Sequence, residues 1–74
     1  MTEGPESLSD REREILALVA TGITNQRIAR DVGISVNTVK AHLRSIFAKL
    51  GVESRTEATT LAIQMGLIRV TPDG

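Results

Sequence analysis

Four pairs of helix start and stop signals divide the 74-residue chain into short segments. Each start is a side chain that can accept a hydrogen bond from a free helix amide: Ser9, Thr24 or Asn25, Ser35 and Ser54. Two starts also have a glutamate three residues on, as in a capping box: Glu12 and Glu57. Each stop is a glycine: Gly22, Gly33, Gly51 and Gly66. The spacing leaves only short turns, so the chain is predicted to be a compact all-helical unit.

The apolar residues repeat at helical spacing between these signals. We predict a helix over residues 10–21, a second from Thr24 or Asn25 to Gly33, a third over residues 36–50, and a fourth between Ser54 and Gly66. The second and third are separated by a turn of roughly three residues, the pattern of a helix-turn-helix. The predicted fold class is therefore all-α, a four-helix bundle that contains a helix-turn-helix.

Composition excludes several other classes of protein. The chain is 41% hydrophobic and 24% charged, which is typical of one small globular domain rather than a disordered segment. It has no cysteine, which rules out disulfides and cysteine-based zinc sites and fits a cytoplasmic location. No apolar run approaches the ~18 residues of a membrane span, and the acidic start lacks the apolar run of a signal peptide.

A formal net charge of zero conceals an uneven distribution of charge. Residues 1–14 carry five acids and two bases, whereas residues 27–55 carry six bases and two acids. The excess positive charge therefore lies in one central segment. Such a segment predicts an anionic partner.

The stretch ISVNTVKAHLRSIFAKL presents two different faces when it is placed on a helix. Its core stripe is apolar: Val36, Val39, Leu43, Ile46, Phe47 and Leu50. The adjoining face carries Lys40 and Arg44 one turn apart, beside the small Ala41 and Ala48. A helix with small residues and exposed cations suits the major groove of DNA, where Arg and Lys donate to guanine. An ordinary solvated helix face is the alternative interpretation.

Other polar residues have simpler interpretations. Thr24, Asn25 and Gln26 begin one predicted helix, and Ser35, Asn37 and Thr38 begin the next, where free amides and hydroxyls suit a phosphate. Lys49 and Arg55 remain open between phosphate contacts and structural salt bridges, and Glu12 is one candidate partner for Arg55. Arg27 and Arg30 are interpreted as solvated or long-range contributors. His42 is expected to pack rather than to bind zinc, because no companion ligands are spaced for a metal site.

The motifs SDRE, GITNQRIA, ISVNTVKAH and KLGVESRTEA together resemble the helix-turn-helix domain of the LuxR/FixJ transcription regulators, also called the GerE-like domain. The resemblance covers residues 8 to about 67. The last two motifs are its most specific part. Residues 1–7 are expected to be a linker remnant or disordered, residues 8–70 the domain, and residues 71–74 a disordered tail.

The resemblance implies an effector domain that binds double-stranded DNA with its third helix in the major groove. It assigns base contacts to Lys40, Ala41 and Arg44. It assigns phosphate contacts to Thr24, Asn25, Ser35, Asn37, Thr38 and Lys49. Many family members are response regulators of two-component systems with an N-terminal regulatory domain. That domain is expected to be absent from this chain, either because the chain is an excised effector domain or because it is a short stand-alone member. RNA polymerase is a further expected partner, and no cofactor, metal or membrane is expected.

The family resemblance also implies a homodimer through the fourth helix. On that helix Ile63 is an apolar residue predicted to lie outside the core, with Thr59 and Thr60 beside it. These three residues are the predicted dimer interface. A scattered surface residue is the alternative for Ile63.

Two other functions remain in competition. Region 4 of a sigma factor has a similar helical pattern, but KLGVESRTEA continuing into a capped fourth helix argues against it. A helical protein-interaction module without DNA binding is the second. An enzyme is not expected, because no catalytic cluster is present.

Overall fold

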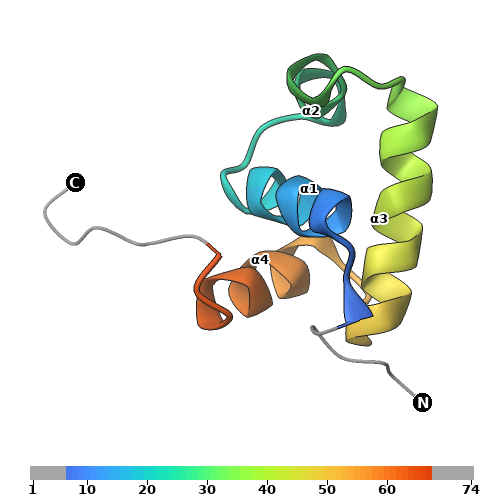
Figure 1. Cartoon of the computed structure of the whole chain (residues 1–74). Helices are drawn as coiled ribbons and strands as arrows, with labels where there is room; N and C mark the ends of the chain where they lie inside the picture. Colours follow the sequence, from blue (N-terminus) through green and yellow to red (C-terminus); the bar gives the residue numbers. More distant parts are fainter. Residues whose placement is uncertain (1–6, 68–74) are drawn as a thin grey trace, which may run out of the picture.

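The computed structural model describes residues 7–67, which form four helices and no strand within that range. They are α1 (Asp10–Ala20), α2 (Asn25–Val32), α3 (Val36–Leu50) and α4 (Arg55–Gln64). Figure 1 shows α1 between α2 and α4, with the long α3 running along one side. The predicted all-α fold with a helix-turn-helix is confirmed. The expectations for residues 1–6 and 68–74 lie outside the described residues.

The predicted serine and threonine start signals all act as caps, but the capping box predicted at Ser54 and Glu57 does not form, because Glu57 Oε1 accepts from the Glu53 amide at 2.7 Å. The hydroxyls of Ser9, Thr24, Ser35 and Ser54 each accept from a backbone N–H three residues on. Ser9 and Glu12 form a complete capping box, in which the Glu12 carboxylate accepts from the Ser9 amide at 2.8 Å. Thr24 rather than Asn25 is the cap of α2.

The helix ends differ slightly from prediction. α1 stops at Ala20, one residue before the predicted end, because Thr21 is the C-cap and its hydroxyl donates to the Leu18 carbonyl. α2 and α3 end at Gly33 and Gly51, whose φ angles of 81° and 71° lie in the left-handed region. α3 has the predicted bounds.

The core is aliphatic, and the one aromatic residue of the chain, Phe47, is only half-buried against it. α1 contacts each of the other helices, and α2 packs mainly on α3. The buried apolar residues are Leu8, Ile15, Leu16, Val19, Ile28, Ala29, Val39, Leu43, Ile46, Ala58 and Ala62. The other residues of the predicted core stripe, Val36, Phe47 and Leu50, are half-buried against this cluster. Within residues 7–67, no helix combines the length and apolarity needed to cross a membrane.

Candidate nucleic-acid interface

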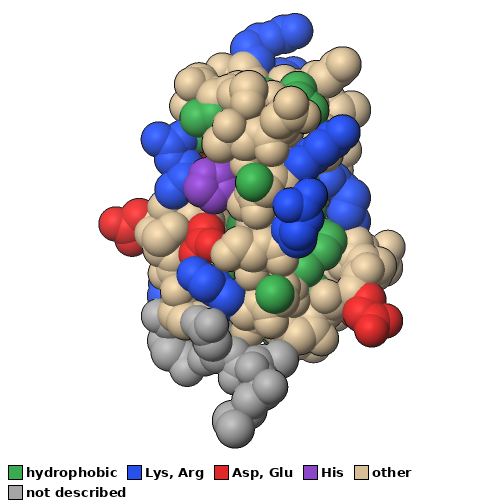
Figure 2. All heavy atoms as spheres, turned by 90° about the vertical axis from the view of Figure 1, so that its right-hand side faces the viewer, with side chains coloured by type: hydrophobic (Ala, Val, Ile, Leu, Met, Phe, Trp, Pro, Cys, Tyr) green, Lys and Arg blue, Asp and Glu red, His purple; other side chains and the backbone are tan. Residues whose placement is uncertain are grey.

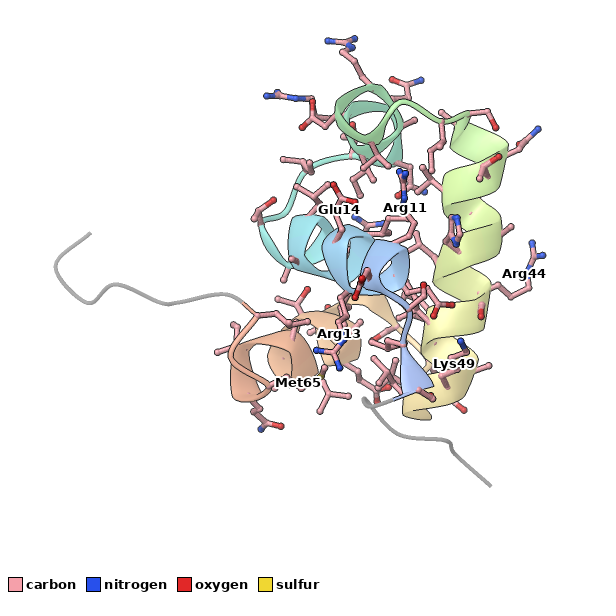
Figure 3. All side chains as sticks on the ribbon, in the orientation of Figure 1. Arg11, Arg13, Glu14, Arg44, Lys49 and Met65 are labelled. Atoms are coloured by element: carbon pink, nitrogen blue, oxygen red, sulfur yellow. The ribbon has the colours of Figure 1, made fainter. Side chains whose placement is uncertain are left out.

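α3 is held by one stripe and exposes another. Val39 and Ile46 are fully buried and Leu43 nearly so, which anchors the helix on the core. Lys40, Ala41 and Arg44 lie on the other side and are exposed. Figure 3 shows Arg44 extending from α3 away from the rest of the domain. The predicted division between a buried stripe and an outward cationic stripe is therefore confirmed.

The surface around α3 suits an anionic groove ligand. Figure 2 faces α3 and shows Lys and Arg side chains gathered around small exposed apolar patches. Ala41 and Ala48 are both exposed, so no large side chain covers the helix backbone at these positions. Small residues flanked by cations allow the backbone of a helix to approach a groove closely while long donors reach its floor.

The start of α3 presents a cluster of hydroxyl and amide groups. The Ser35 hydroxyl accepts from the Thr38 amide at 3.1 Å and lies 2.9 Å from the Thr38 hydroxyl. Ser35, Asn37 and Thr38 are all exposed. The cap satisfies only one of the amides that lack an intrahelical partner, so the first turn keeps donors suited to a phosphate.

The start of α2 offers a second group of donors. Thr24 is exposed, and its hydroxyl accepts from the Arg27 amide at 3.1 Å. Asn25 is half-buried, and its Oδ1 atom accepts from the Arg55 guanidinium at 2.7 Å. Arg27 pairs with Asp31 at 3.2 Å on the exposed side of the same helix. Arg27 therefore has an acidic partner within its own helix.

Lys49 occupies a different environment from Lys40 and Arg44. Its Nζ atom lies 2.9 Å from Glu12 Oε1 and 3.2 Å from the Ser7 carbonyl oxygen. The Lys49 side chain is only 25% exposed. Two of the three ammonium protons are therefore used within the protein, which limits what remains for a phosphate.

Glu12 is buried, and it does more than the capping role predicted from the sequence. Its carboxylate also accepts from the Ser45 hydroxyl at 3.0 Å. The hydrogen bond from Lys49 and that from the Ser9 amide lower the pKa of Glu12 to about 2, against the opposing effect of burial. The sequence contains one signal for these contacts around Glu12: Ser45 and Lys49 lie one turn apart beside the core stripe of α3.

Arg55 does not pair with Glu12, so that suggestion was wrong. Its guanidinium donates to Asn25 Oδ1 and to the Ile23 carbonyl oxygen, at 2.7 and 3.0 Å. The direction of α4 brings Arg55 to the turn before α2, whereas Lys49 is the cation that reaches Glu12. His42 is half-buried on α3.

The outward side of α4 carries the residues predicted to form a dimer interface. Ile63 is 39% exposed and is the one large hydrophobic residue that is exposed within residues 7–67. Thr60 is exposed and Thr59 is half-buried.

Comparison with known proteins identifies the family of this chain. Residues 6–62 match the family described as bacterial regulatory proteins, luxR family. The chain is 52% identical over 60 residues to the probable transcriptional regulatory protein SgaR of Hyphomicrobium methylovorum, which covers 81% of the chain and 28% of that protein. It is 47% identical over 64 residues to the response regulator protein VraR of Staphylococcus aureus, covering 86% of the chain and 31% of VraR.

A third relative is the transcriptional regulatory protein YdfI of Bacillus subtilis, which is 44% identical over 63 residues, or 85% of the chain and 30% of YdfI. The chain thus spans less than a third of the length of these curated relatives. The chain belongs to the luxR family of bacterial regulatory proteins and is a helix-turn-helix DNA-binding domain of that family.

Proposed function

We propose that this domain binds double-stranded DNA sequence-specifically, with α3 in the major groove. The observation that carries the proposal is the placement of Lys40 and Arg44. They are exposed one turn apart on α3, while Val39, Leu43 and Ile46 of the same helix are buried. A helix anchored in this way can enter a groove without exposing the core.

Each part of the surface has a distinct role in this proposal. Lys40 and Arg44 donate to base edges, and Arg44 has the forked geometry that matches the two acceptors of guanine. Ala41 contacts the base edges without keeping the backbone away. The residues at the starts of α2 and α3 position the domain on the phosphates: Thr24, Asn25, Ser35, Asn37 and Thr38. Lys49 contributes its remaining proton and its charge at longer range.

We extend the proposal to the whole regulator. Two copies associate through Thr59, Thr60 and Ile63 of α4 and bind two half-sites about one helical turn apart. The name of VraR supports a response regulator as the parent protein, with the present domain as its effector part in the cytoplasm. Contacts with RNA polymerase belong to the same proposal, because a regulator bound at a promoter lies beside that enzyme.

The alternative of a sigma-factor region 4 receives no support from the fold after α3. The segment after Gly51 forms a capped fourth helix, α4, that packs on α1. If the domain is instead a protein-interaction module, it should bind no duplex, and replacing Lys40 or Arg44 should have no effect on DNA affinity. A direct binding measurement therefore separates the main proposal from the protein-interaction module, whereas the capped α4 is the feature that argues against the sigma-factor alternative.

The test begins by selecting duplexes from a random-sequence pool with the wild-type chain. Affinity for the selected duplex is then measured in mobility-shift assays over a range of salt. We expect Lys40→Ala and Arg44→Ala each to weaken binding by about 1–3 kcal/mol. Arg44→Ala should also relax the preference at the base it contacts.

Arg30→Ala is the matched control, because it removes one exposed cation from α2 rather than from α3. It should weaken binding much less and leave the base preference unchanged. The proposal fails if the wild type selects no duplex. It also fails if the double variant Lys40→Ala, Arg44→Ala binds the selected duplex as tightly as the wild type.

A further inference from the structure

Arg55 forms a link between the first residue of α4 and the first turn of α2. Its NH1 group donates to Asn25 Oδ1 at 2.7 Å, and its NH2 group donates to the Ile23 carbonyl oxygen at 3.0 Å. The partners lie 30 and 32 residues away in sequence. Figure 1 shows α2 and α4 on opposite sides of α1. The side chain therefore bridges two helices whose main packing partners are α1 and α3.

Local preference does not explain an arginine at this position. Arg55 is the first residue of α4, where the positive end of the helix dipole disfavours a cation. Its guanidinium is half-buried and reaches two acceptors outside its own helix. The long-range hydrogen bonds must therefore outweigh the local electrostatic cost.

The bond to Arg55 determines which way the Asn25 carboxamide faces. A guanidinium has only donors, so the asparagine must turn its oxygen toward Arg55. The NH₂ group of the same carboxamide is then directed away from the guanidinium. Without Arg55 the carboxamide is free to rotate. It can then turn its oxygen toward a phosphate, and the two oxygens repel each other.

The second bond fixes the same region through the backbone. The Ile23 carbonyl lies in the connection between α1 and α2, immediately before the Thr24 cap. Arg55 thus holds both the turn that leads into α2 and the first side chain of that helix. Two bonds from one planar group restrict rotation more than one bond does.

We propose that Arg55 is a positioning residue for DNA binding, which orients Asn25 so that its NH₂ group donates to a backbone phosphate. This inference rests on the proposed function. Arg55 acts through Asn25 rather than by contacting DNA itself. Removing Arg55 should therefore cost much more affinity when Asn25 is present than when it is absent.

The test is a double-mutant cycle with Arg55→Met and Asn25→Ala in the 74-residue chain. The probe is the duplex that the wild type selects from a random-sequence pool. Arg55→Met should weaken binding about tenfold in the wild-type background, the scale of one hydrogen bond to a charged group. In the Asn25→Ala background the same change should weaken binding less than about twofold.

Two further variants separate orientation from charge. Arg55→Lys keeps the charge but cannot donate to two acceptors as a planar fork, so it should weaken binding about threefold. Arg30→Met removes an exposed cation from α2 and should have the same small effect in both backgrounds. In ¹⁵N spectra of the free domain, Arg55→Met should shift the Asn25 side-chain amide signals, and Arg30→Met should not.

The outcomes are distinguishable. If Arg55→Met weakens DNA binding by the same factor with and without Asn25, this role is overturned, while the proposed function is unaffected. A wild-type chain that selects no duplex overturns the proposed function and this role together. If Arg55→Met does not fold by helicity and thermal melting, Arg55→Lys completes the cycle, and additive losses for it overturn the role equally.

Discussion

Lys49 of α3 forms an ion pair with the buried Glu12 of α1, with 2.9 Å between Nζ and Oε1. Only 7% of the Glu12 side chain is exposed, and its carboxylate also accepts from Ser9 and Ser45. A carboxylate in such a place is tolerated because every oxygen has donors. The pair joins the start of α1 to the end of the helix that carries Lys40 and Arg44.

The first prediction concerns acid stability. Because the folded pKa of Glu12 is lowered from 4.5 to about 2, its contribution is fully present above pH 4.5 and is lost as the pH falls toward 2. The shift corresponds to at most about 3 kcal/mol, and solvent around the partly exposed Lys49 reduces it to about 1–2 kcal/mol. Urea unfolding at pH 7, 4.5 and 2.5 measures this loss.

Glu12→Gln is the control for that prediction. Glutamine keeps an oxygen for the Ser9 amide but does not titrate. Its free energy of unfolding should fall less between pH 4.5 and 2.5 than that of the wild type. An identical pH dependence in the two proteins would show that other carboxylates cause the acid sensitivity.

The second prediction concerns Lys49→Met. This change leaves the Glu12 carboxylate without the cation that contributes most to its low pKa, so that pKa should rise. We expect a loss of about 1–3 kcal/mol in the free energy of unfolding. Combining it with Glu12→Gln should recover part of the loss, because no unpaired charge remains.

The same variant tests the phosphate contact predicted for Lys49. A direct phosphate contact adds about 0.9 to the slope of log affinity against log salt concentration. Because its ammonium is already bonded to Glu12 and Ser7, we expect Lys49→Met to change that slope by much less than about 0.9. If Lys49→Met instead changed the slope by about 0.9, Lys49 would be a direct phosphate contact despite its ion pair with Glu12.

The third prediction concerns the outer face of α4. Ile63→Glu should weaken dimerisation on DNA, because it places a charge on the exposed apolar residue of the proposed interface. The fold should remain intact, since Ile63 lies outside the buried core. Cooperative binding to a two-half-site duplex, measured by mobility shift, provides the test.

Ile63→Ala removes apolar contact without adding a charge. It should therefore weaken the cooperativity of DNA binding less than Ile63→Glu does. Thermal melting of the free domain should be nearly unchanged in both variants. Undiminished cooperativity for Ile63→Glu would remove Ile63 from the interface.

The fourth prediction concerns the turn between α2 and α3. Gly33 ends α2 with φ at 81°, and the space around an added Cβ is open. Gly33→Ala should therefore destabilise the domain by about 1 kcal/mol through backbone conformation alone. Gly33→Asn should cost less, because asparagine tolerates the left-handed region better. Chemical denaturation of both variants measures the difference, and equal losses would count against a conformational cause.

The sequence by itself determined the helices and their faces. The caps at Ser9, Thr24, Ser35 and Ser54, and the buried and exposed stripes of α3, depend on residues at most four apart. Such spacing is set by helix geometry before any tertiary contact forms. The outward placement of Lys40 and Arg44 was therefore predictable, as was membership of the family from local motifs.

Only the tertiary structure decided which long side chains meet. Lys49 reaches Glu12 across 37 residues of sequence, and Arg55 reaches Asn25 across 30, whereas local reasoning had suggested Glu12 for Arg55. These choices depend on the angles at which helices cross, which follow from the packing of the whole core. Long flexible cations have many acceptors within reach in an unfolded chain. The packed helices restrict Lys49 to Glu12 and the Ser7 carbonyl, and Arg55 to Asn25 and the Ile23 carbonyl.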